Sequence, residues 1–73
     1  MGGMFFDIEF FGIGADGKPV GPDRITYPGH NIEGAIAKAK RIMPMNTFRF
    51  GRASSFKIYA NGILAYVSGS ASA

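Results

Sequence analysis

Hydrophobic and polar residues alternate near the start of the chain. In an extended conformation, one side of the chain would carry Phe6, Ile8 and Phe10, and the other side would carry Asp7 and Glu9. This alternation predicts a strand over residues 4–13 with one buried face.

A tight reversal follows at Asp16-Gly17, because an Asp-Gly pair readily takes the backbone angles of a hairpin turn. Pro19, Gly21 and Pro22 come next, and each interrupts or weakens strand pairing. The second strand is therefore predicted to be short, over residues 24–27, and to lie at an edge of the sheet.

A helix is predicted after Asn31, which is a suitable N-cap residue and is followed by Glu33 in the first turn. Apolar residues then recur at the three- and four-residue spacing of one helix face. They are Ile32, Ala35, Ile36, Ala39, Ile42 and Met43. Pro44 cannot continue the helix, so the helix is expected to end before it.

The strongest short-range signal is Asn61-Gly62, which stands between two alternating runs and predicts a hairpin with a two-residue turn. The predicted pairs are Ala60 with Ile63, Tyr59 with Leu64, Ile58 with Ala65, Lys57 with Tyr66 and Phe56 with Val67. This register gives a buried face of Phe56, Ile58, Ala60, Ile63, Ala65 and Val67, and an outer face of Lys57, Tyr59, Leu64 and Tyr66.

Together these elements predict a two-layer α+β domain of order ββαββ, in which one helix packs on a four-stranded, mainly antiparallel sheet. Residues 1–73 form a single domain in this interpretation, with residues 1–3 and 69–73 frayed. In so short a chain, burial of about a dozen apolar side chains nearly balances the entropy lost on folding. The domain is therefore expected to gain stability from a partner.

The composition excludes several kinds of chemistry. The chain has 73 residues, no cysteine and one histidine, so it offers no disulfide, no thiolate metal site and no thiol nucleophile. Asp7 and Glu9 are the only close carboxylate pair, and an open sheet face lacks the burial that tunes a general acid. We expect no enzymatic activity, no cofactor and no metal site.

His30 and Asn31 stand just before the predicted helix, where backbone amides and the helix dipole favour an anion. They are candidates for an anion site, and the alternative is that they are ordinary turn and cap residues.

No apolar stretch approaches the roughly 20 residues of a membrane span. Asp7 and Glu9 also interrupt the first apolar run before a signal-peptide core could form. A cytoplasmic location and no membrane partner are expected.

The net charge of +3 hides a divided chain. Residues 1–33 carry two cations against five acids, whereas residues 34–73 carry six cations and no acid. The six are Lys38, Lys40, Arg41, Arg49, Arg52 and Lys57. Phe48 and Phe50 flank Arg49, and such interleaving of cations and aromatics is typical of nucleic-acid contacts. Weak, sequence-tolerant nucleic-acid binding is therefore one hypothesis, and a solvated helix face and loop is the alternative.

One helix can cover only one side of a sheet, so the other side is predicted to expose large apolar groups. These are Phe5, Phe11, Tyr59, Leu64 and Tyr66. Carboxylates beside Lys57 on the same face are typical of a self-complementary two-fold contact. The leading hypothesis is a non-enzymatic interaction protein that forms a homo-oligomer, in the simplest case a dimer, through this aromatic outer face.

Three segments resemble those of small uncharacterised bacterial proteins of strand-strand-helix-strand-strand order. They are A-D-G-K-P-V-G-P at 15–22, G-A-I-A-K-A-K-R-I-M at 34–43 and F-K-I-Y-A-N-G-I-L-A-Y-V at 56–67. Such proteins carry no assigned activity, so this resemblance implies only a fold.

A second resemblance covers a shorter stretch. Tyr27-Pro28-Gly29, followed by Ile32-Glu33-Gly34-Ala35, is similar to the strand-to-helix part of HicB-type antitoxins. This chain lacks the extra strand before the helix, and Gly34 stands where that pattern favours an acid. The resemblance implies an antitoxin-like partner protein as a third hypothesis.

Overall fold

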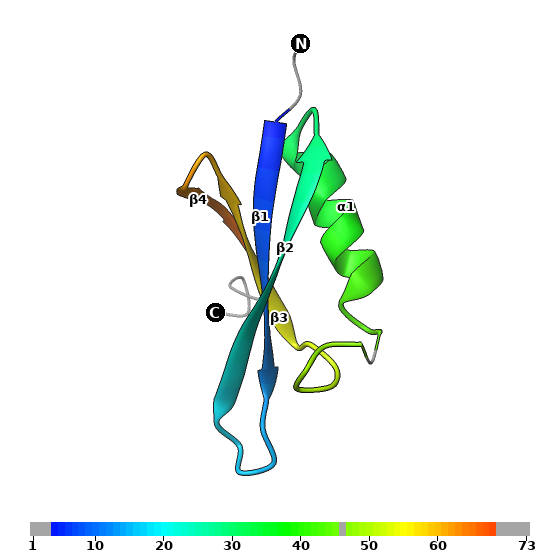
Figure 1. The fold of residues 1–73 in the computed structure, drawn as a ribbon, viewed down its shortest axis with the longest axis vertical. Coiled ribbons are helices and arrows are strands. Elements are labelled where there is room, and N and C mark those ends of the chain that lie inside the picture. Colours follow the sequence, from blue (N-terminus) through cyan, green and yellow to red (C-terminus); the bar gives the residue numbers. More distant parts are fainter. Residues whose placement is uncertain (1–3, 46, 69–73) are drawn as a thin grey trace.

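The computed structural model describes residues 4–45 and 47–68 (Figure 1). Its elements are β1 (Met4–Ile13), β2 (Pro19–Gly29), α1 (Ile32–Ile42), β3 (Ser55–Ala60) and β4 (Ile63–Val67). The four strands form one antiparallel sheet in the order β2-β1-β3-β4, and α1 packs on it. The predicted α+β fold of order ββαββ is confirmed. The predicted frayed ends, residues 1–3 and 69–73, lie outside the described residues.

The core lies between α1 and the inner face of the sheet. Its buried side chains are Phe6, Ile8 and Phe10 of β1, Ala35 and Ala39 of α1, Phe56 and Ile58 of β3, and Ala53. The alternation predicted for residues 4–13 is therefore confirmed. On the helix side the fully buried positions are alanines, which let the helix backbone approach the sheet closely, so the sheet supplies most of the buried volume.

Strand β2 is longer than the predicted residues 24–27. It begins at Pro19, and its pairing with β1 passes through an irregularity between Phe10 and Gly12 before resuming at Val20. Gly21 makes this passage with a φ of 112°, in the region that favours glycine. The ten-residue β1 offers a long template, so pairing continues on both sides of the interruption. β2 is an edge strand, as predicted.

The β3–β4 hairpin follows the predicted register only near its turn. Asn61 and Gly62 have φ values of 54° and 79°, and the pairs Ala60 with Ile63 and Tyr59 with Leu64 are confirmed. Beyond them a bulge inserts Ala65. The observed pairs are then Ile58 with Tyr66 and Lys57 with Val67, and the Ser68 N–H donates to the Phe56 carbonyl.

The bulge moves Tyr66 from the predicted outer face to the inner face. There its ring stacks on that of Phe56, with centroids 5.7 Å apart. The prediction of Tyr66 on the outer face is wrong, because the bulge lets a large aromatic ring pack on the core and turns Val67 outward instead. The Phe56 N–H donates to the Ser68 hydroxyl at 2.7 Å, which anchors the shifted end.

The predicted burial of Ile63 and Ala65 is also wrong. Both are exposed, and Ile63 keeps 71% of its surface. The helix packs on β1, β2 and β3, whereas β4 is the edge strand farther from the helix (Figure 1). A helix is about 10 Å wide and strands are about 4.8 Å apart, so one helix covers part of a four-stranded sheet.

The molecule is elongated. Its principal extents are 45 × 28 × 19 Å and its radius of gyration is 12.4 Å. A compact chain of this length would have a radius of gyration of about 11 Å. The β1–β2 hairpin accounts for the difference, since it reaches well past the end of α1 (Figure 1).

Candidate functional site

The outer face of the sheet, which turns away from α1, is built from cross-strand rows. The strand register gives one row of Thr26, Asp7, Tyr59 and Leu64, and a neighbouring row of Arg24, Glu9, Lys57 and Val67. Both rows put charged or polar groups in the middle of the sheet and aliphatic groups on β4. The centre of this face is therefore polar, and the carboxylates lie beside Lys57 there, as predicted.

The charges in these rows have partners within the chain. Arg24 Nη2 lies 2.8 Å from Glu9 Oε2, and this hydrogen bond raises the pKa of Arg24. The Thr26 hydroxyl lies 3.2 Å from Asp7 Oδ1. A shallow recess above them is lined by Asp7, Glu9, Arg24, Tyr59 and Gly62. The carboxylate pair thus takes part in sheet contacts, which the sequence did not indicate.

The five predicted interface residues are not brought together. The Lys57 ammonium lies 5.3 Å from the centroid of the half-buried Phe11 ring, a cation–π contact that covers part of that ring. Tyr66 lies on the inner face, and Tyr59 is half-buried. Phe5 and Leu64 remain open, with 66% and 48% of their surface exposed.

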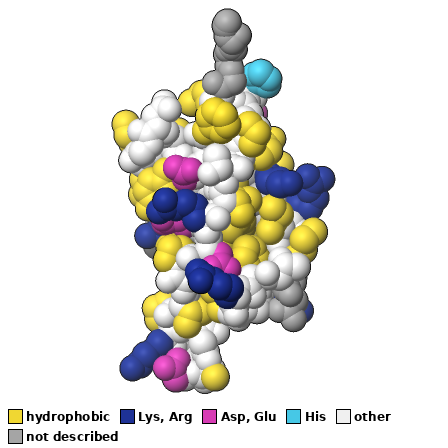
Figure 2. Space-filling model, viewed as in Figure 1, with side chains coloured by type: hydrophobic (Ala, Val, Ile, Leu, Met, Phe, Trp, Pro, Cys, Tyr) yellow, Lys and Arg dark blue, Asp and Glu magenta, His cyan; other side chains and the backbone are white. Residues whose placement is uncertain are grey.

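Three exposed apolar side chains and the half-buried Tyr59 lie around the β3–β4 turn. The pairing of β1 with β3 ends at Phe6 and Ala60, and Ala60 is the last residue before the turn. Phe5 therefore lies near the Asn61-Gly62 turn, and β3 separates it from Ile63 and Leu64 on β4. We call Phe5, Tyr59, Ile63 and Leu64 the hairpin patch. Figure 2 shows hydrophobic side chains around this end of the molecule and, farther down, hydrophobic side chains among acidic and basic groups.

Sequence reasoning missed Ile63, because alternation assigned it to the buried face. Two facts in the sequence could have identified it: four strands are predicted, and only one helix is available to cover them.

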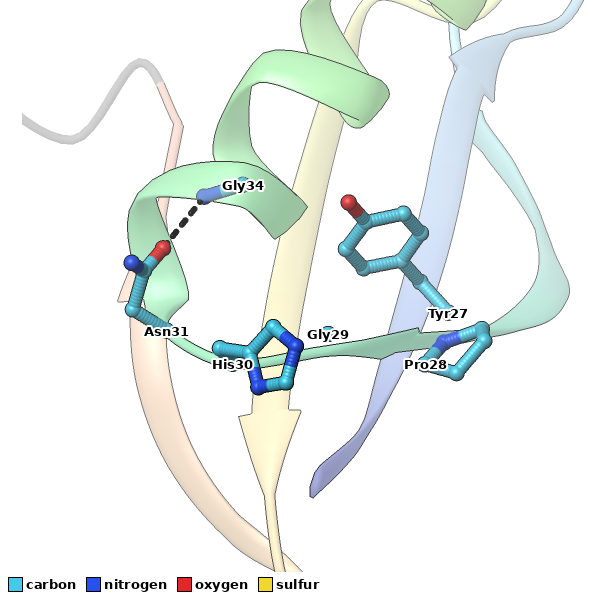
Figure 3. Close-up of a pocket in the computed structure, with 6 residues that line it drawn as sticks. All are labelled: Tyr27, Pro28, Gly29, His30, Asn31 and Gly34. Atoms are coloured by element: carbon cyan, nitrogen blue, oxygen red, sulfur yellow. Dashed lines mark hydrogen bonds between the residues drawn. The ribbon is translucent and has the colours of Figure 1, made fainter. Parts of the chain in front are cut away.

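The candidate anion residues lie at the start of α1 (Figure 3). Asn31 Oδ1 accepts a hydrogen bond from the Gly34 N–H at 3.0 Å, so Asn31 is the helix N-cap, as predicted. The adjoining recess is lined by Tyr27, Pro28, Gly29, His30, Asn31 and Gly34. A Cβ at Gly29 would lie 2.7 Å from Tyr27 Cε2, and one at Gly34 would lie 3.2 Å from its hydroxyl. These glycines therefore make room for the Tyr27 ring. Anion binding by His30 and Asn31 stays a prediction.

The basic residues lie in three separate places. Lys38, Lys40 and Arg41 are on α1, Arg49 and Arg52 are on the loop after it, and Lys57 is on the outer face of the sheet. Arg49 is bound to Asp23: its backbone N–H and its Nε each lie 2.9 Å from an oxygen of that carboxylate. The bond from the backbone N–H is the main reason that the pKa of Asp23 is lowered.

The aromatic rings beside Arg49 pack within the protein. Phe48 and Phe50 stack at 5.5 Å with an angle of 7° between their planes, and Phe48 lies 4.7 Å from Phe10. Both rings are half-buried. The sequence pattern of alternating phenylalanine and arginine suggested contacts with nucleic-acid bases. In the structure, the two rings instead attach the loop to the core.

Among residues 4–45 and 47–68, no three His, Asp or Glu side chains gather where they could hold a metal ion. No helix within the same residues is long and apolar enough to cross a membrane. Comparisons of the chain with protein-family models, curated proteins and solved structures gave no match. The case for a function therefore rests on the geometry of the chain.

Proposed function

We propose that this protein is a non-enzymatic, cytoplasmic interaction domain that self-associates through the hairpin patch. The supporting observation is that exposed apolar groups lie near one turn, with Phe5 and Leu64 on the outer face and Ile63 on the helix side. The described part of the chain exposes five large hydrophobic residues, and Phe5, Ile63 and Leu64 are three of them. The other two, Ile13 and Met45, lie elsewhere. Isolated exposed hydrophobic residues are common on proteins, but a contiguous group usually marks an interface.

Energy considerations favour a partner at this patch. Complete burial of a large apolar side chain contributes about 1.5–3 kcal/mol relative to full exposure. The core holds five fully buried large side chains, so the domain has little stability in reserve. Covering the hairpin patch would add burial of the same kind.

The neighbouring charges suit a second copy of the same chain. Asp7 and Lys57 lie next to the patch on adjacent rows of the outer face. A two-fold contact places each group of one chain near the same set in its partner, so mixed charges at the rim can meet their opposites. A uniformly charged rim would repel its own copy.

The test is a mass measurement by light scattering or sedimentation equilibrium from micromolar to millimolar concentration. The wild-type mass should rise above the monomer value of 7.8 kDa, and the double variant Ile63→Ser, Leu64→Ser should stay at it. The matched control is Ile13→Ser, Met45→Ser, which removes two hydrophobic residues of similar exposure outside the patch. A wild-type protein that stays monomeric throughout this range would refute the proposal.

A second candidate, nucleic-acid binding, is favoured by α1 alone. Its second half carries Lys38, Lys40 and Arg41, and among the described residues neither ion pair involves them. Binding through them would weaken as the salt concentration rises. Each phosphate contact would contribute about −0.7 to −0.9 to the slope of log affinity against log salt concentration. Replacing all three by alanine should abolish binding to single-stranded and duplex probes, whereas Lys18→Ala should not. Failure of the wild type to bind at low salt would exclude this candidate.

A further inference from the structure

We infer that β4 pairs antiparallel with β4 of a second copy, so that two four-stranded sheets join into one eight-stranded sheet. This inference rests on the proposed self-association and specifies how it occurs. It follows from a difference between the two edges of the sheet, from the direction of the Leu64 backbone, and from the two faces on which the hairpin patch lies.

The β4 edge is protected from pairing only by its short length and by the bulge at Ala65. Its sequence, I-L-A-Y-V, contains no charge and no proline, and Ile63, Leu64 and Ala65 are exposed. Native edge strands are commonly blunted by lysine, proline or a covering element, because an open apolar edge recruits further strands. Here α1 packs on the other three strands. An edge of this composition therefore favours a paired state.

The opposite edge, β2, is blunted. It carries Pro19, Pro22 and Pro28, which cannot donate to an incoming strand, and Arg24 lies between them. Within residues 4–45 and 47–68, each copy thus has one edge without charge or proline and one blunted edge. Pairing β4 with β4 is a two-fold contact that consumes both open edges, so growth ends at two copies. This closure favours a second copy of the chain as the occupant.

The backbone of Leu64 points away from its own sheet. The Ser68 N–H donates to the Phe56 carbonyl at 2.9 Å, so the Phe56 peptide groups face β4. The direction of the backbone hydrogen-bonding groups alternates from one residue to the next along a strand. The N–H and carbonyl of Ala60, four residues after Phe56, therefore also face β4, where Ile63 is the partner. The next residue, Leu64, then directs its N–H and carbonyl outward. The bulge at Ala65 limits the regular part of this edge, so the pairing centres on Leu64.

Edge pairing also covers the two β4 members of the hairpin patch, Ile63 and Leu64, although they lie on opposite faces. Ile63 is opposite Ala60 on the helix side of the sheet, and Leu64 is opposite Tyr59 on the outer side. A continuous sheet would place a partner side chain next to each. Stacking two outer faces would leave Ile63 uncovered, and it would take the Arg24–Glu9 pair out of water at a high desolvation cost.

The first test is amide hydrogen exchange at Leu64. In a monomer this N–H points to solvent and exchanges fast. In the paired state its exchange should slow as the protein concentration rises, while the exposed turn amide of Gly62 should not change. Fast Leu64 exchange in a sample whose measured mass is that of a dimer would overturn the inference.

The second test separates the backbone from the side chain. Leu64→Pro removes the outward N–H and keeps an apolar group, and edge strands accept proline where the N–H faces solvent. It should return the mass to 7.8 kDa. The matched control is Thr26→Pro on β2, where the same alternation turns the N–H away from β1. Retention of the fold by both variants is checked by circular dichroism.

The outcomes distinguish the two proposals. A dimer that survives Leu64→Pro but dissociates with Ile63→Ser, Leu64→Ser overturns edge pairing and leaves self-association through the patch intact. A wild-type protein that is monomeric at every concentration overturns both. Loss of the dimer in Leu64→Pro, but not in Thr26→Pro, together with slow Leu64 exchange, supports the inference.

Discussion

The two hairpins of this sheet differ in what holds them in place. The β1–β2 hairpin contributes Phe6, Ile8 and Phe10, which are buried, and it tolerates an irregularity at Gly21. The β3–β4 hairpin has the better turn sequence but ends in an exposed strand. Turn quality and burial are therefore independent. The hairpin with the clearer local signal carries the exposed β4, although its other strand buries Phe56 and Ile58, and the one with the weaker signal buries three large side chains.

The largest expected effect breaks the first hairpin. Phe10→Ala removes a fully buried ring that contacts Phe48 and Phe56. A substitution of this kind costs about 3–5 kcal/mol, which approaches the total stability of so small a domain. Thermal unfolding followed by circular dichroism should show a chain that is largely unfolded at room temperature. Leu64→Ala in the second hairpin is the control and should cost far less. Equal melting temperatures for the two variants would contradict this account.

The next effect compares two glycines with positive φ. A Cβ at Gly21 would lie 2.8 Å from the Phe10 carbonyl oxygen, whereas one at Gly62 would meet nothing within 4 Å. Gly62→Ala should cost about 1 kcal/mol from backbone strain, and Gly21→Ala about 2–3 kcal/mol, because it adds a clash with fixed backbone. Urea unfolding of the two variants measures the difference. The reverse order would show that β2 can shift without cost.

A smaller effect tests the register of the second hairpin. Tyr66→Ala should lower the free energy of unfolding by about 1–2 kcal/mol, because it removes the ring stacked on Phe56. Tyr59→Ala on the outer face is the matched control and should cost less. Both values are measured on the monomer at low concentration. A larger cost for Tyr59→Ala than for Tyr66→Ala would contradict the placement of Tyr66 on the inner face.

The smallest effect concerns the attachment of the Arg49 loop to β2. The hydrogen bond from the Arg49 N–H lowers the pKa of Asp23 from its ordinary value of 3.8. The folded carboxylate is favoured, so its contribution is present above pH 3.8 and is lost as the pH falls through the lower folded value. The Arg49 amide resonance should titrate with a midpoint below 3.8 and should lose this step in Asp23→Asn. A midpoint at or above 3.8 would contradict the contact.

The sequence predicted the elements well because their signals are local. Alternation in β1, the Asn31 cap and the Asn61-Gly62 turn each depend on residues close together in the chain. The errors arise where a distant contact decides. Tyr66 lies on the other face because its ring stacks on Phe56. β2 is longer than its prolines suggest, because β1 is long enough to pair with it on both sides of the irregularity.

The candidate site was predicted less well for the same reason. Phe5, Tyr59 and Leu64 were assigned to the outer face correctly, since the turn fixes the register nearby. The exposure of Ile63 depends on how far α1 reaches across the sheet, and the loss of Phe48 as a surface ring depends on its contact with Phe10. Neither distance is encoded in a periodic pattern.

The elongated shape affects how self-association is observed. A molecule with extents of 45 × 28 × 19 Å has more friction in solution than a sphere of equal mass. It therefore leaves a size-exclusion column early, and a monomer can be mistaken there for a larger species. Two copies joined through β4 would be longer still and would tumble very unequally about their axes. Rotational diffusion measured by NMR relaxation would then report the dimer through its anisotropy as well as through its mass.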